Sequence, residues 1–170
     1  MRYFILISFT LYISCSFCTS QENKDDTIAK GIKIDSIVVQ KAERTMTIFS
    51  NQKAIKTYKI ALGKNPVGKK QFEGDMKTPE GLYTIDAKSS YSKFHKNLNV
   101  SYPNANDMEY AKSQGKKAGS EIKIHGLPNN YNENNYVRYD WTWGCIALTN
   151  SEIDELYNHV KIDCKILILP

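Results

Sequence analysis

The chain has 170 residues, of which 41% are hydrophobic and 24% are charged. This length and composition are typical of one globular domain that buries its own core without disulfide bonds. The formal net charge of +5 is too small, and its lysines and arginines are too evenly spread, to indicate binding to nucleic acid.

The first 20 residues have the three-part layout of a secretory signal. Arg2 supplies a positive charge, an uncharged apolar run covers Tyr3 to Ile13, and small residues follow. The apolar run is too short to span a bilayer stably, although a retained membrane anchor stays an alternative. Cys15 resembles the lipidated residue of a bacterial lipoprotein signal, and lipidation there and simple cleavage both stay open. We therefore expect export to the periplasm or cell envelope.

Residues 21–30 are polar and are predicted to form a short tether, so the folded domain is expected over residues 31–170. Alternating apolar and β-branched residues predict three strands near the start of this domain. These strands cover Ile32 to Val39, Thr45 to Phe49 and Ala54 to Leu62. A polar turn joins the second strand to the third, which predicts a β meander.

A segment rich in glycine and proline separates this meander from a strand predicted over Leu82 to Ile85. It lacks the Gly-Lys-Ser/Thr sequence of a phosphate-binding loop. A short strand is predicted within Lys93 to Tyr102. A helix is predicted over Asp107 to Gln114, with Asn106 or Asp107 as its cap.

The three histidines do not form a metal site by spacing. His95, His125 and His159 are far apart in the sequence and have no partners at ligand spacing. We therefore expect no metal, and we expect His95 to lie at the surface.

His125 ends a short alternating strand. Ile122 and Ile124 face one way, and Lys123 and His125 face the other. Gly126 follows and lets the backbone turn sharply. The alternation favours a histidine that faces a cleft, but spacing alone supports a surface histidine equally well.

Cys145 lies in a segment with a well-defined orientation. If Gly144 to Leu148 is extended, Ile146 and Leu148 point into the core, and Cys145 and Ala147 point away. A helix is predicted to follow directly, which would fix the chain just behind the thiol.

Several signals define that helix. Thr149 and Glu152 form a capping box, and Leu148 and Ile153 can form a hydrophobic staple. The expected buried stripe consists of Ile153, Leu156, Tyr157 and Val160.

Cys164 is predicted to be a buried strand residue, because alternation places it on the same face as Ile166 and Ile168. A disulfide between Cys145 and Cys164 stays open, since exported proteins often form such bonds.

A cysteine and a histidine of this kind can perform nucleophilic catalysis. His125 can accept the thiol proton, and the carbonyl group of Gly126 can hold the imidazole in the required tautomer. The backbone N–H groups of Gly144 and Cys145 can donate to an oxyanion. Asp140 can assist substrate binding.

The segment resembles the L,D-transpeptidase (YkuD-type) catalytic domain. That family has His-Gly followed by a Ser/Thr-His-Gly-Cys block, and this chain has His125 and Gly126 followed by Thr-Trp-Gly-Cys at 142–145. The stretch ALGKNPVGKKQFEGDMKTPEGLYTI, at 61–85, is similar to the glycine-rich blocks of the family. The resemblance covers residues 34–170.

Two positions depart from the family pattern. Trp143 stands where the usual histidine is found, and Ala147 stands where an arginine is common. The block resembles a murein-modifying subgroup that includes hydrolases.

The resemblance implies a mainly β fold, a sandwich or barrel with one or two short helices. It implies that Cys145 attacks peptidoglycan stem peptides, that His125 transfers protons, and that an amine resolves the thioester to give a 3-3 cross-link or attachment to the wall. No metal or organic cofactor is implied. The residues expected to contact substrate are Asp140, Trp141, Thr142 and Trp143.

Three alternatives stay open. Water can resolve the thioester, which would make the protein a hydrolase that trims stems or releases wall-linked protein. The domain can also be a wall-binding module without catalysis, in which Cys145 is dispensable. A cysteine peptidase acting on proteins is the third alternative, although the chain carries no protease signature.

Overall fold

The structure, a computed structural model, describes residues 27–170. The expected signal, the Cys15 lipidation site and the first part of the tether lie outside the described residues. The strands are β1 (Ile34–Gln40), β2 (Thr45–Ser50), β3 (Lys53–Lys59), β4 (Gly81–Ser92), β5 (His95–Val100), β6 (Lys123–His125), β7 (Ile146–Ala147) and β8 (Val160–Leu169). The helices are α1 (Ala105–Ser113), the short 3-10 helix η1 (Glu133–Asn135) and α2 (Asn150–His159).

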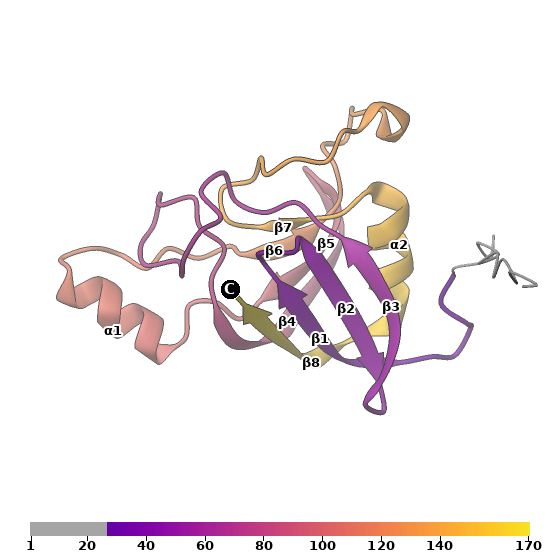
Figure 1. The fold of residues 1–170 in the computed structure, drawn as a ribbon, viewed down its shortest axis with the longest axis horizontal. Helices are drawn as coiled ribbons and strands as arrows, with labels where there is room; N and C mark the ends of the chain where they lie inside the picture. The colour runs from indigo at the N-terminus through magenta and orange to yellow at the C-terminus, as the bar shows by residue number, and fades with distance from the viewer. Residues whose placement is uncertain (1–26) are drawn as a thin grey trace, which may run out of the picture.

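The strands form one curled sheet with the order β3-β2-β1-β8-β4-β5-β6-β7 (Figure 1). The chain just beyond β3 reaches the opposite edge, where Ala61 pairs with Ala147 and Gly63 pairs with Thr142. The N–H of Ala61 donates to the Ala147 carbonyl at 2.9 Å, and the reverse bond measures 2.8 Å. These bonds close the sheet, so the predicted mainly β, barrel-like fold is confirmed.

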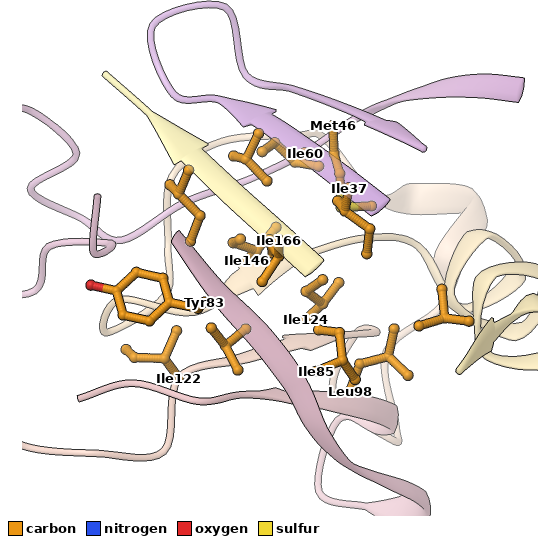
Figure 2. Packing of buried hydrophobic residues seen from close by; sticks show 14 of the residues in the cluster. Ile37, Met46, Ile60, Tyr83, Ile85, Leu98, Ile122, Ile124, Ile146 and Ile166 are labelled. Carbon is orange, nitrogen blue, oxygen red and sulfur yellow. The ribbon is translucent and has the colours of Figure 1, made fainter. Parts of the chain in front are cut away.

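Alternation along the strands fills the interior of the sheet. In the parallel pairing of β1 with β8, Ile37 lies beside Ile166. Figure 2 shows both of these side chains pointing into the same interior as Ile85, Ile124 and Ile146. All five are buried. This core holds β6 and β7, which carry the functional candidates.

Helix α2 begins as predicted. Thr149 is its N-cap, and the reciprocal bonds of the capping box with Glu152 are both present. Ile153 and Leu156 are buried in the core cluster, together with Leu148 from the preceding turn. The helix packs against β5 and β6 and covers the strand that ends at His125.

Helix α1 begins two residues earlier than predicted. Its N-cap is Asn104, whose side chain accepts from the N–H of Asp107. Asp107 is therefore the third helical residue, and its carboxylate completes the capping box. The predicted caps, Asn106 and Asp107, are therefore wrong, because both residues lie inside the helix. Asp107 is buried, and its carboxylate accepts from the Tyr83 hydroxyl.

Two segments are more ordered than their composition predicts. Strand β4 continues to Ser92 because β8 pairs with its first half and β5 pairs with its second half. Ile28 lies in the expected tether, but it is buried and its N–H donates to Glu155 of α2 at 2.6 Å. The folded domain therefore includes residues before 31. Within residues 27–170, no helix is long and apolar enough to cross a membrane.

Candidate active site

The parallel pairing of β6 with β7 brings the predicted histidine and cysteine together. Ile124 pairs with Ile146, and His125 pairs with Ala147. The same register places Lys123 beside Cys145. Because neighbouring residues in a sheet point to the same face, Lys123, His125 and Cys145 share the face opposite to the core isoleucines.

His125 is more enclosed than the alternation predicts. Its side chain is buried beneath Phe94 and Trp141, whose ring centroids lie 4.7 and 5.6 Å from the imidazole centroid. Burial lowers the pKa of His125 to about 4, and the charge of Lys123 acts in the same direction. The imidazole is therefore neutral at neutral pH.

The hydrogen bond that His125 makes defines its tautomer. Nδ1 lies 2.7 Å from the carbonyl oxygen of Gly126, the contact that the sequence suggests. A carbonyl oxygen only accepts, so Nδ1 carries the proton and Nε2 keeps its lone pair. This is the form of imidazole that can accept a proton from a thiol.

Gly126 is required by close packing. A Cβ atom there would lie 2.5 Å from Asn150 Oδ1 and 3.0 Å from the Cβ of His95. The same Asn150 oxygen accepts from the N–H of Leu127 at 2.8 Å. The first residue of α2 thus fixes the backbone just after the histidine.

Cys145 is a partly enclosed, free thiol. Its Sγ lies 3.4 Å from the carbonyl oxygen of Glu121, to which it donates. Burial raises the pKa of the Cys145 thiol above its ordinary 9.0, although the N–H and the charge of Lys123 oppose this effect. The resting site therefore holds a neutral thiol and a neutral imidazole.

Thr142 and Gly144 shape the turn before the thiol. The hydroxyl of Thr142 donates to the Cys145 carbonyl at 2.7 Å and accepts from the Gly144 N–H at 3.1 Å. Thr142 is buried. Its hydroxyl therefore holds the turn, and the substrate contact that the sequence suggests stays a prediction. The Gly144 N–H is likewise already bonded within the protein, which leaves the Cys145 N–H as the candidate oxyanion donor.

The upstream glycine-rich segment supports this turn. Gly144 has a φ of +126°, and a Cβ atom there would lie 2.6 Å from the Lys77 carbonyl oxygen. A Cβ atom on Gly63 would lie 2.1 Å from the Met76 carbonyl oxygen and 3.1 Å from the Cα of Gly144. The Gly63 N–H donates to Thr78. The backbones at Gly63, Met76–Lys77 and Gly144 therefore pack so closely that the two glycines cannot carry a side chain.

Asp140 also has internal partners. One carboxylate oxygen accepts from Arg44 at 2.9 Å, and the other accepts from the Leu62 N–H at 2.9 Å. Asp140 thus anchors the loop to the end of the meander, and the substrate contact that its type suggests stays a prediction.

The two tryptophans differ in exposure. Trp143 is 69% exposed, with the Lys64 ammonium 6.0 Å from its ring centroid. Trp141 is half-buried against His125, and its indole N–H donates to the Tyr136 hydroxyl at 3.3 Å. A small pocket opens beside it and is lined by Leu127, Pro128, Tyr131, Tyr136, Tyr139 and Trp141. Both tryptophans can contact a bound peptide.

The remaining cysteine and histidine predictions concern residues outside this cluster. Cys164 is buried beside Ile166 and Ile168, as predicted, and both it and Cys145 are free thiols. His95 is partly exposed and lies 2.7 Å from Asp154. Among residues 27–170, no group of three or more His, Cys, Asp or Glu side chains could hold a metal ion.

Sequence reasoning missed three residues around the thiol and imidazole. Lys123 and Glu121 flank Cys145, and alternation places Lys123 on the same face of β6 as His125. Glu121 precedes β6 and has a φ of +63°, so alternation does not place it. Phe94 covers His125 from the turn between β4 and β5. Its contact is long-range, so no local pattern could have indicated it.

Comparison with known proteins is consistent with this arrangement. The protein YafK of Escherichia coli (strain K12) is 29% identical over 147 residues, which cover 83% of this chain and 52% of YafK. The chain thus spans about half the length of the curated relatives it matches.

Solved structures have the same fold. The helical cell shape determining protein Pgp2 of Campylobacter jejuni (K307A mutant) superposes with a TM-score of 0.63 at 26% identity, over 87% of this chain and 50% of that chain. Bd1075 of Bdellovibrio bacteriovorus gives a TM-score of 0.55 at 25% identity, over 84% and 50% of the two chains. Residues 34–168 match the YkuD family model, the L,D-transpeptidase catalytic domain. The chain therefore belongs to the L,D-transpeptidase catalytic domain family.

Proposed function

We propose that this protein is a peptidoglycan-modifying enzyme of the cell envelope that transfers acyl groups of stem peptides through Cys145. The observation that carries the proposal is the register of β6 and β7, which places His125 and Cys145 on one face of neighbouring parallel strands. Family membership supports the substrate class. The name of the relative Pgp2, a cell shape determining protein, supports a role at the wall.

In the proposed first step, the Cys145 thiol attacks the carbonyl carbon of the third stem residue. His125 Nε2 takes the thiol proton as the S–C bond forms, because its lone pair is available and its Nδ1 proton is held by Gly126. The C–N bond then breaks, and the proton passes to the leaving amine. A thioester remains on Cys145.

Proton removal and attack are coupled in this proposal. The pKa of Cys145 is raised and that of His125 is lowered, so a resting thiolate–imidazolium pair is disfavoured in the free protein. The Cys145 N–H is the proposed donor to the developing oxyanion, since the Gly144 N–H is already bound to Thr142.

The thioester can be resolved by an amine of a second stem or by water. The amine gives a 3-3 cross-link or attachment to the wall, and water gives a trimmed stem. The exposed Trp143 favours keeping hydrolysis as the second candidate, because it stands where the family commonly has histidine and offers no proton-transfer group there.

The test compares the protein with its Cys145→Ala variant on defined tetrapeptide muropeptides, with and without an acceptor amine, by mass spectrometry. Dimers that have lost the fourth residue indicate transfer, whereas tripeptides alone indicate hydrolysis. Equal products from both proteins would exclude the thiol mechanism. Acyl-enzyme formation at full rate in a His125→Gln variant would exclude His125 as the base.

A further inference from the structure

A lysine and a glutamate lie on either side of the Cys145 thiol. Extending the β6–β7 register by one residue from the pair Ile124 and Ile146 places Lys123 beside Cys145. The N–H and the charge of Lys123 both act on the Cys145 thiol. The carbonyl oxygen of Glu121 accepts a hydrogen bond from the Cys145 thiol, and the Glu121 carboxylate forms an ion pair with the Lys123 ammonium. The nucleophile therefore faces a cation that already holds a carboxylate.

The two partners of this ion pair differ in exposure. The side chain of Lys123 is 29% exposed, whereas that of Glu121 is 74% exposed. An exposed ion pair of this kind contributes little to stability, so the Glu121 carboxylate can be replaced at small cost. Lys123 is the more enclosed partner, and its backbone is held in β6.

The other cation near the thiol is already occupied. Lys70 is buried, and its ammonium donates to the Asp75 carboxylate at 2.8 Å and to the Phe72 carbonyl at 3.1 Å. Asp75 in turn accepts from three backbone N–H groups of its own loop. Lys70 thus serves to hold the loop, and a ligand that enters the site meets Lys123 first.

We propose that Lys123 binds the free carboxylate of the residue that leaves the acyl donor, and that Glu121 occupies this position in the resting protein. The inference rests on the proposed function. In a peptide, the carboxyl carbon of the leaving residue lies within about 4 Å of the scissile carbonyl carbon. A carboxylate so close to the scissile carbon needs a cation beside the thiol, and the charge of Lys123 acts on both Cys145 and His125. The ligand class is peptides with a free α-carboxylate one residue beyond the scissile bond.

The exchange of carboxylates on Lys123 leaves the charge of the site unchanged. One carboxylate replaces another on an ammonium that stays protonated. When Sγ bonds to the carbonyl carbon and the C–N bond breaks, the leaving amino acid takes the thiol proton through His125 and departs with its carboxylate. The Glu121 carboxylate then returns to Lys123. Donors that are amidated or extended at this position cannot make the exchange.

The test compares a tetrapeptide stem that ends in a free carboxylate with the same stem ending in a carboxamide. The readout is the ratio of their kcat/KM values in the wild type and in Lys123→Met. We expect the wild type to prefer the acid roughly tenfold or more, and Lys123→Met to bring the ratio close to one. The charge of Lys123 also favours the thiolate. Its loss in Lys123→Met slows the reaction of both peptides alike, so this effect cancels in the ratio.

Three further variants sharpen the readout. Lys123→Arg keeps the charge and should keep the preference for the acid. Glu121→Gln removes the competing carboxylate and should lower the KM of the acid alone. Lys64→Met removes a different cation, beside Trp143, and should leave the ratio unchanged.

Two outcomes overturn the inference: a wild type that does not distinguish the acid from the amide, or a Lys123→Met variant that keeps the wild-type ratio. In either case the proposed function stands if Cys145→Ala abolishes turnover. If the wild type turns over neither peptide, the proposed function fails. Calorimetric binding of the two peptides to the Cys145→Ala protein and to its Lys123→Met double variant then still decides the carboxylate contact.

Discussion

The side chain of Thr142 closes a ring of hydrogen bonds with the backbone of Cys145. Its hydroxyl donates to the Cys145 carbonyl at 2.7 Å while it accepts from the intervening Gly144 N–H at 3.1 Å. A single buried hydroxyl thus fixes the peptide groups on both sides of the turn. The backbone that carries the proposed nucleophile is held by the protein before any substrate arrives.

Replacing Thr142 by valine should lower both stability and activity. Valine has a similar shape but leaves the Gly144 N–H and the Cys145 carbonyl unsatisfied, which costs about 1–3 kcal/mol for each buried group. Denaturant unfolding should show this loss, and acyl-enzyme formation should slow. Thr142→Ser keeps the hydroxyl and serves as the control. Equal stability of the valine and serine variants would contradict the role of the hydroxyl.

Gly144→Ala should be far more damaging than Gly115→Ala. Both glycines have positive φ, at +126° and +66°, so both substitutions strain the backbone. A Cβ atom on Gly144 would also lie 2.6 Å from the Lys77 carbonyl oxygen, whereas nothing lies within 4 Å of one on Gly115. Melting temperatures and turnover of the two variants measure the difference. Comparable losses would mean that strain alone, without the contact, sets the cost.

The burial of His125 predicts a pH-dependent stability. The folded pKa of about 4 lies below the ordinary value of 6.5, so the unfolded chain binds the proton first as the pH falls. The contribution of His125 is therefore constant above about pH 6.5. It is lost progressively down to about pH 4, by about 3 kcal/mol in total.

The measurement is the free energy of unfolding of the wild type and of His125→Gln over this pH range. Carboxylates with lowered pKa values, such as Asp75 and Glu155, are present in both proteins and cancel in the difference. The difference should decrease as the pH falls. A difference that does not change with pH would mean that the folded imidazole binds a proton as readily as the unfolded one.

Alkylation should distinguish the two free cysteines. The pKa of Cys145 is raised above 9.0, so its rate with iodoacetamide should rise about tenfold per pH unit between pH 7 and 9. Cys164 is buried with a pKa of about 12 and should stay unmodified until the protein unfolds. Mass spectrometry of labelled peptides reads both sites. A rate for Cys145 that is already constant at pH 7 would indicate a resting thiolate.

Asp140→Ala should destabilise the protein without a specific effect on KM. The substitution leaves the buried Leu62 N–H without its acceptor and Arg44 without its partner, and the first of these alone costs about 1–3 kcal/mol. Thermal unfolding and steady-state kinetics test this. A raised KM with unchanged stability would return Asp140 to the substrate-binding role that its sequence position suggests.

Local sequence patterns predicted the features that depend only on residues close together in the chain. The capping box of Thr149 and Glu152, the buried face of Cys164 and the alternation before His125 all depend on residues a few positions apart. The structure has each of them. The position of Cys145 follows from the helix behind it, which explains why the segment could be oriented from sequence alone.

The features that were missed depend on contacts between distant residues. The closure of the barrel through Ala61 and Ala147 cannot be read from either segment alone. Nothing local indicates that the hydroxyl of Thr142 is buried and holds the turn. The enclosure of His125 by Phe94 joins residues 31 positions apart, so alternation could give its direction but not its burial.

The parallel pairing of β6 with β7 places His125 at the end of β6 and Cys145 just before β7, and the exposed side chains lie on the connection between these strands. Parallel neighbours cannot be joined by a tight hairpin, so a long crossover has to connect His125 to Cys145. The strands set the reacting pair, while the crossover carries the exposed tyrosines and Trp143. If Cys145 and His125 react as proposed, changes in this connection can alter which acceptor is admitted without moving these two residues. Diversification of specificity would be expected to concentrate there.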